Sequence, residues 1–156
     1  MGFGDTIRKV IEEECEDYFL GIADLSSTKN DIIEQYGSFF SQYPRAISIG
    51  ITIPYKITDE LLMSENTGVY KETNCQLNTI TTHLSSLLQQ KGYKTLAVPK
   101  SKRMNDETFI SIHKLAANLA DLGEIEKSGL LVTPEVGHGV NWGTVLTDAP
   151  VEAINL

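Results

Sequence analysis

A strict alternation of isoleucine with small residues is the feature of this sequence that most constrains its fold. Isoleucine occupies every second position from Ile47 to Ile53, and serine, glycine and threonine fill the positions between. Successive side chains of a β-strand point to opposite faces, so this period of two predicts a strand with one β-branched face and one small face. We expect a core against the isoleucine face. The small face can be approached closely by a helix or by a planar ligand.

Amphipathic helices are predicted on both sides of this strand. Apolar residues recur at helical spacing in residues 6–18, after Asp5 as a candidate N-cap. A longer apolar stripe runs through residues 67–91, and Gly92 supplies the left-handed position that ends this helix. Three shorter helices are predicted: one opening at Ser26 and ending at Pro44, one over residues 57–64, and one over residues 113–122 that Gly123 closes.

Short strands alternate with these helices. Besides the isoleucine strand, strands are predicted over residues 19–24, 93–98, 130–133 and 144–147, with residues 134–142 as a loop before the last one. Because 156 residues suit one domain with a sizeable core, we expect a single domain over residues 1–156. Its fold class is α+β, with helices packed on a largely antiparallel sheet.

Composition and charge exclude several functional classes. No apolar run approaches the roughly 20 residues that cross a bilayer, and no secretory leader pattern is present, so a cytoplasmic protein without membrane contact is expected. The net charge is −8, although residues 91–114 hold six basic and two acidic side chains. Nucleic acid is an unlikely partner, because phosphate contacts supply most of that affinity. The basic residues of segment 91–114 are still compatible with a local binding site for a small anion.

The two cysteines, Cys15 and Cys75, lie far apart in the sequence and within helical patterns. This spacing is typical of reduced, packed thiols and not of a metal site. A four-iron cluster needs four thiolates, so this chain alone holds no iron–sulfur cluster. No other metal centre is predicted either, since His138 has only Glu135 nearby as a strong ligand and a catalytic zinc takes three protein ligands.

Several stretches carry a family resemblance when they are read in order. They are Tyr43-Pro44-Arg45-Ala46-Ile47-Ser48-Ile49-Gly50, His113-Lys114-Leu115-Ala116-Ala117, Leu130-Leu131-Val132-Thr133-Pro134-Glu135 and Thr144-Val145-Leu146-Thr147-Asp148-Ala149-Pro150. They resemble the epoxyqueuosine reductase family and its small prokaryotic iron–sulfur relatives, whose patterns FPRAISIG, HK-x-AA, LL-x-TPE and TVLTDAPL follow the same order. The resemblance covers nearly the whole chain.

The resemblance implies a fold and a cofactor. Members of this family are expected to hold cobalamin in an N-terminal domain related to cobalamin-processing and nitroreductase-like proteins, followed by a ferredoxin-like domain with two iron–sulfur clusters. The present chain ends at Leu156, where the cluster-binding domain would begin. The resemblance therefore implies a separate ferredoxin-like protein that donates electrons to this chain. Assembly of the chain into a homodimer is also left open.

The sequence departs from the family at the turn after residues 113–122. The family reads Gly-Leu-Gly-Trp-Ile-Gly-Lys, whereas this chain reads Asp121-Leu122-Gly123-Glu124-Ile125-Glu126-Lys127. Carboxylates there add bulk and negative charge near the expected cofactor site. The family's Gly-x-Arg-x-Arg is replaced by Gly137-His138-Gly139-Val140-Asn141, which removes two anion-pairing guanidinium groups.

Candidate site residues follow from the resemblance and from their chemistry. The proton-donating carboxylic acid of the family falls near Asp106 or Glu107, and the flanking residues do not decide between them. Candidates for cofactor binding are His113, Lys114, Gly123, Lys127, Gly137 and Trp142. For four of them a structural role is the alternative: a solvated helix start for His113 and Lys114, an exposed lysine at 127, and a core plug for Trp142.

Three functions are consistent with these features. The first is a corrinoid-binding redox domain that depends on a separate iron–sulfur electron donor. The second is a binding or regulatory module that has lost the cofactor site, which the acidic substitutions favour. The third is a flavin-dependent, nitroreductase-like oxidoreductase, suggested by the fold kinship that the resemblance implies and by the small face of the isoleucine strand.

Overall fold

The computed structural model describes residues 3–25, 43–52, 68–98, 112–125, 131–134, 140–149 and Val151. Its helices are α1 (Phe3–Glu12), α5 (Gly68–Gln90) and α6 (Ile112–Leu119). Its strands are β1 (Tyr18–Asp24), β2 (Arg45–Thr52), β3 (Thr95–Ala97), β4 (Glu124–Ile125), β5 (Leu131–Val132) and β6 (Val140–Thr147). In this part of the chain no helix is long and apolar enough to cross a bilayer.

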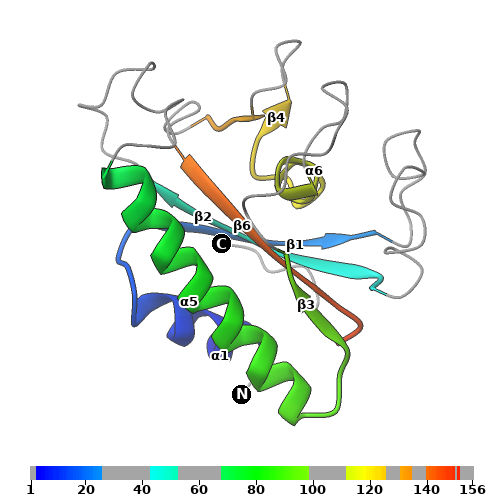
Figure 1. Cartoon of the computed structure of the whole chain (residues 1–156). Coiled ribbons are helices and arrows are strands. Elements are labelled where there is room, and N and C mark those ends of the chain that lie inside the picture. Colours follow the sequence, from blue (N-terminus) through cyan, green and yellow to red (C-terminus); the bar gives the residue numbers. More distant parts are fainter. Residues whose placement is uncertain are drawn as a thin grey trace, which may run out of the picture.

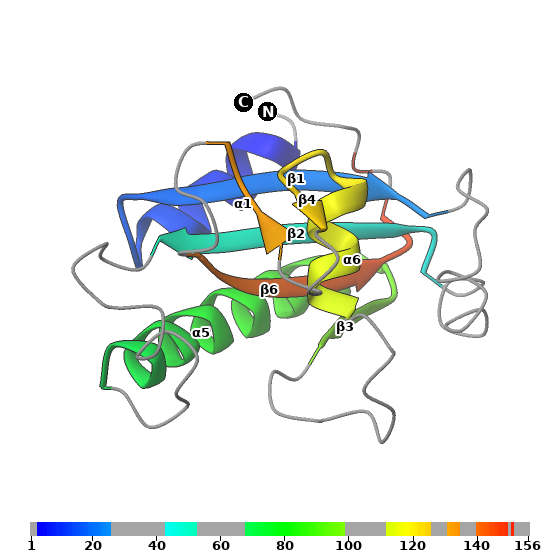
Figure 2. The ribbon, with the colours of Figure 1, turned by 90° about the horizontal axis from the view of Figure 1, so that it is seen from above.

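A four-stranded antiparallel sheet in the order β1-β2-β6-β3 forms the centre of the fold. Helices α1 and α5 cover one face of this sheet, and α6 lies across the other face (Figures 1 and 2). A separate two-stranded antiparallel ribbon, β4-β5, lies on the same side as α6. The predicted α+β class, with helices on a largely antiparallel sheet, is therefore confirmed.

The alternation in β2 gives the strand an isoleucine face and a face of small residues, as the sequence predicted. Ile47 and Ile49 are fully buried in the cluster that α1 and α5 close with Ile11, Leu77 and Ile80. The close approach of α5 is visible at Gly143 of β6, where an added Cβ would lie 3.0 Å from Cδ2 of Leu77. The isoleucine face therefore supplies the main core.

The small face of the sheet is covered by the protein itself. A Cβ added at Gly21 would lie 2.9 Å from Cβ of Ala120, at the end of α6. A Cβ added at Gly50 would lie 2.6 Å from the indole of Trp142 on the neighbouring strand. These two glycines are needed because a helix and a large ring pack directly on the strand backbone.

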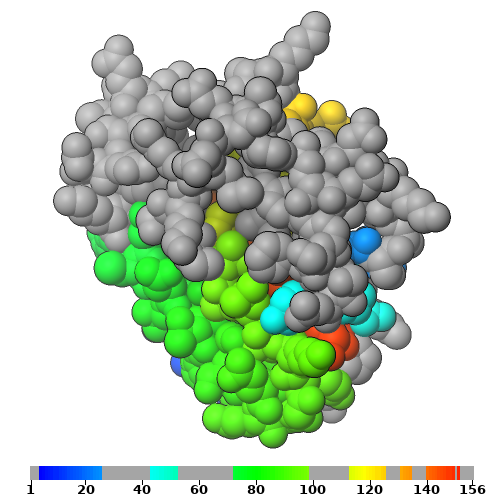
Figure 3. Space-filling view, turned by 45° about the vertical axis from the view of Figure 1, so that its right-hand side comes forward, coloured from blue at the N-terminus to red at the C-terminus, as the bar shows by residue number. Residues whose placement is uncertain are grey.

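Hydrogen bonds connect helix α5 to strand β3, the edge strand next to β6. The two elements lie side by side on the surface (Figure 3). The hydroxyls of Ser85 and Thr95 are 2.6 Å apart, and Thr95 also donates to the Ser85 carbonyl. As predicted, Gly92 ends α5 with a positive φ of 93°. The amides of Gly92 and Tyr93 bond back to the carbonyls of Gln89 and Leu88, which satisfies the helix end.

Two helix boundaries differ from the sequence prediction. Helix α1 begins at Phe3, so Asp5 lies in its first turn and is not the N-cap, and it ends at Glu12 because pairing of β1 with β2 already starts at Tyr18. Helix α6 is closed by Asp121 and not by Gly123. Asp121 has a φ of 65°, and the Leu122 amide bonds back to the Ala117 carbonyl in the usual pattern of a helix C-terminus.

The C-terminal strands also differ from prediction. Strand β6 begins at Val140 and pairs with all eight residues of β2, so Asn141 and Trp142 lie in a strand and not in a loop. Within residues 130–133, which were predicted as a strand, the structure has the two-residue strand β5, and it pairs with β4 in the separate ribbon. The predicted helices after Ser26 and over residues 57–64 lie outside the described residues.

Candidate functional site

A cavity at the C-terminal end of α6 is the candidate site within the described residues. Its volume is about 410 Å³, and it lies between the turn that follows α6 and the β4-β5 ribbon. The residues that line it are Asn118, Asp121, Leu122, Gly123, Glu124, Val132, Thr133 and Pro134. Pockets of a few hundred cubic ångströms hold drug-sized ligands or parts of larger ones.

Gly123 lies in the wall of this cavity for a steric reason. An added Cβ would come within 2.8 Å of the Val132 carbonyl oxygen, so only glycine permits β5 to pack this closely. The side-chain amide of Asn118 donates to the Gly123 carbonyl at 2.9 Å and fixes the turn to the helix end. The packing of the ribbon therefore accounts for Gly123, and its role as a cofactor contact stays a prediction.

The described side chains of the cavity wall carry negative charge. Asp121 and Glu124 line the cavity and are exposed, and none of the lining residues that the structure describes is basic. The cavity also faces the C-terminal end of α6, where the helix carries partial negative charge. These groups favour a cation or a neutral N–H donor next to them over a phosphate or a carboxylate.

His113 lies at the opposite end of α6 and is buried. Its Nδ1 is 2.9 Å from the Thr144 hydroxyl, so the imidazole connects the start of α6 to the centre of β6. The alternative of a solvated helix start is therefore wrong for His113. The neighbouring Lys114 is half-buried, and burial lowers the pKa of its ammonium group below the usual value.

Trp142 fills the space between the sheet and the β4-β5 ribbon. It is 5% exposed and packs with Leu131 and Val140, and its ring centroid lies 5.8 Å from that of Phe19. The indole also lies against Gly50. Packing therefore explains this tryptophan, and stacking on a ligand ring stays a prediction.

Asn141 is a buried polar residue whose role the sequence did not indicate. Its side-chain amide donates to the Thr73 hydroxyl and to the Asn74 side-chain oxygen, each at 2.8 Å, which connects β6 to the first half of α5. Because residues 141 and 142 alternate across the sheet, Asn141 points to the α5 face, away from the cavity.

Ser48 is a second buried polar residue that sequence reasoning missed. Within the part of the chain that the structure describes, its hydroxyl is the one buried side-chain polar atom without a hydrogen-bond partner. Ser48 pairs with Gly21 and Thr144 on the face that α6 covers. Its place between two isoleucines predicts that its side chain points to the small face of the strand, but nothing in the sequence predicts that the hydroxyl has no partner.

The structure brings together some candidates and separates others. Gly123 and Trp142 lie at the ribbon end of α6, because Trp142 packs in one cluster with Leu122 next to Gly123. His113 and Lys114 lie at the other end of this helix. Four candidates lie outside the described residues: Asp106, Glu107, Lys127 and Gly137. The same is true of Lys100, Lys102 and Arg103, three of the six basic residues in segment 91–114.

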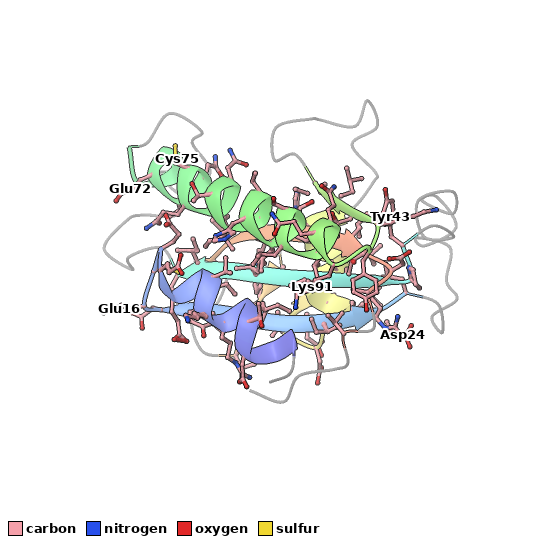
Figure 4. The ribbon with its side chains drawn as sticks, turned by 90° about the horizontal axis from the view of Figure 1, so that it is seen from below. Glu16, Asp24, Tyr43, Glu72, Cys75 and Lys91 are labelled. Carbon is pink, nitrogen blue, oxygen red and sulfur yellow. The ribbon has the colours of Figure 1, made fainter. Side chains whose placement is uncertain are left out.

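Among the described residues, no three histidine, cysteine or carboxylate side chains form a group that could hold a metal ion. Cys15 is half-buried just after α1, and burial, with Glu14 and Asp17, raises the pKa of its thiol. Cys75 is exposed on α5 (Figure 4). A raised pKa disfavours the thiolate, which is the form that binds iron.

Iron analysis after anaerobic cluster reconstitution is therefore expected to find no stoichiometric iron in the purified protein. Two cysteines, one of them held as a thiol, cannot supply the four thiolates of a cubane cluster. Iron and sulfide are measured together with protein concentration. A content of about four irons per monomer or per dimer, that of one cubane, would contradict the argument from cysteine.

Comparison with known proteins supports the fold. Neither a protein-family model nor a curated protein matches the sequence. Among solved structures, a catabolic reductive dehalogenase superposes with a TM-score of 0.67 at 14% identity, over 97% of this chain and 21% of its own. Epoxyqueuosine reductase from Streptococcus thermophilus gives 0.61 at 14% identity, over 99% and 48%. The Bacillus subtilis enzyme, described with its catalytic loop swung out of the active site, gives 0.57 at 13% identity, over 97% and 46%.

These solved structures share the fold of this chain along almost all of its length. The resemblance to epoxyqueuosine reductases that the sequence predicted is therefore confirmed as a shared, reductase-like fold. The present chain spans about half the length of the epoxyqueuosine reductases and about a fifth of the dehalogenase.

Proposed function

We propose that this chain is a corrinoid-binding redox domain that receives electrons from a separate iron–sulfur protein. The observation that carries the proposal is the reductase-like fold, shared along 97–99% of the chain with epoxyqueuosine reductases and a reductive dehalogenase. The family that the sequence resembles holds cobalamin in the corresponding domain. A separate electron donor is proposed because the chain has two cysteines, too few for a cluster of its own.

In this proposal the described residues contact one edge of a corrinoid. The cavity at the end of α6 is smaller than the whole cofactor, so it would take only part of its rim. A corrin ring carries primary amide side chains, whose N–H groups are suitable donors for the carboxylates of Asp121 and Glu124 and for the backbone carbonyls of the turn. The turn itself is held by Gly123 against β5.

When bound, a corrinoid supplies a cobalt centre that changes oxidation state by single electrons. The chain's own part is to bind and orient the ring. Helix α6 is fixed at its start by the bond between His113 and Thr144, and at its end by the bond from Asn118 to Gly123. Two such anchors keep the cavity wall rigid, which lowers the entropy cost of ordering it around a ligand. In the proposal, Asp106 or Glu107 is the carboxylic acid that donates a proton to the substrate, the role that the resemblance implies.

Titration of the purified protein with hydroxocobalamin tests the proposal. Binding is expected to shift the visible absorption bands of the cobalamin, with saturation at one equivalent per chain. Unfolded protein at the same concentration is the control, since it retains the side chains without the fold. A spectrum that stays unchanged up to high protein concentration would argue strongly against corrinoid binding.

A binding or regulatory module without redox chemistry is the second candidate. It is favoured because the carboxylates of Asp121 and Glu124 line the cavity, and because His113, Gly123 and Trp142 all have packing roles. The expected fold kinship still supports the flavin alternative, but the small face of the isoleucine strand does not. The small face of β2 is covered over Gly50 by Trp142, and that of β1 over Gly21 by Ala120, so no room remains there for a planar ring.

A further inference from the structure

We draw no further inference here: the strongest candidate, the exposed and uncharged stripe on the outer face of α5 formed by Cys75, Thr79, Thr82 and Ser86, is only a row of small side chains, and nothing in the described part of the structure shows what covers it.

Discussion

Replacing Trp142 with alanine is expected to lower the free energy of unfolding by about 3–5 kcal/mol. The indole is 5% exposed and fills the space between β2, Phe19 and the β4-β5 ribbon, so its removal leaves a large cavity. Because this ring also supports the wall near Gly123, the ribbon is expected to loosen first. Chemical denaturation followed by tyrosine fluorescence and circular dichroism measures the change.

The variant Trp142→Phe is the matched control. It keeps an aromatic ring next to Phe19 and is expected to lose clearly less stability than the alanine variant. A change under about 1 kcal/mol for Trp142→Ala, well below the usual range for such a truncation, would contradict the core role. Together with a loss of corrinoid affinity, that result would instead identify Trp142 as a ligand-stacking residue.

Ile49→Ala is expected to cost about 2–5 kcal/mol of unfolding free energy. Ile49 is fully buried in the centre of β2, between the flanking strands and beneath α1 and α5, so neighbouring side chains cannot easily fill the space. Urea denaturation measures the shift in midpoint, with an unchanged slope as the sign that the unfolded state is unaffected.

Ser48→Ala, one residue earlier on the same strand, is the control for this prediction. Its hydroxyl has no partner, so its removal is expected to be neutral or to stabilise the fold by about 1 kcal/mol. If instead Ser48→Ala destabilises and Ile49→Ala changes stability by under about 1 kcal/mol, the two faces of β2 have been assigned the wrong way round.

The central fold was predictable because local patterns determine it. The alternation in residues 47–53 fixed the two faces of β2, and Gly92 marked the end of α5. Helix boundaries were less predictable, since the pairing of Tyr18 with Ile51 and the closing position of Asp121 depend on tertiary contacts. An aspartate in the left-handed conformation is uncommon, and the nearby Gly123 was the more obvious helix terminator.

The candidate site was less predictable than the fold. The sequence indicated Gly123 and Trp142, and the structure places both at the ribbon end of α6. A core plug was already the alternative role for Trp142, but the sequence did not indicate its partners, because Phe19 and Gly50 lie far away in sequence. The packing role of Gly123 was not indicated either, because it depends on how closely β5 folds back onto the turn. The same holds for the bonds of His113 and Asn141 to distant elements.

Amide hydrogen exchange with and without corrinoid tests the central claim most directly, because it reports both binding and its location. With a saturating concentration of hydroxocobalamin, exchange is expected to slow in peptides covering residues 112–134, which include α6, the turn at Gly123 and β5. Exchange in α1 (Phe3–Glu12), on the opposite face of the sheet, is expected to stay unchanged. Unchanged exchange throughout the chain, or protection confined to α1 and α5, would contradict the proposed corrinoid site.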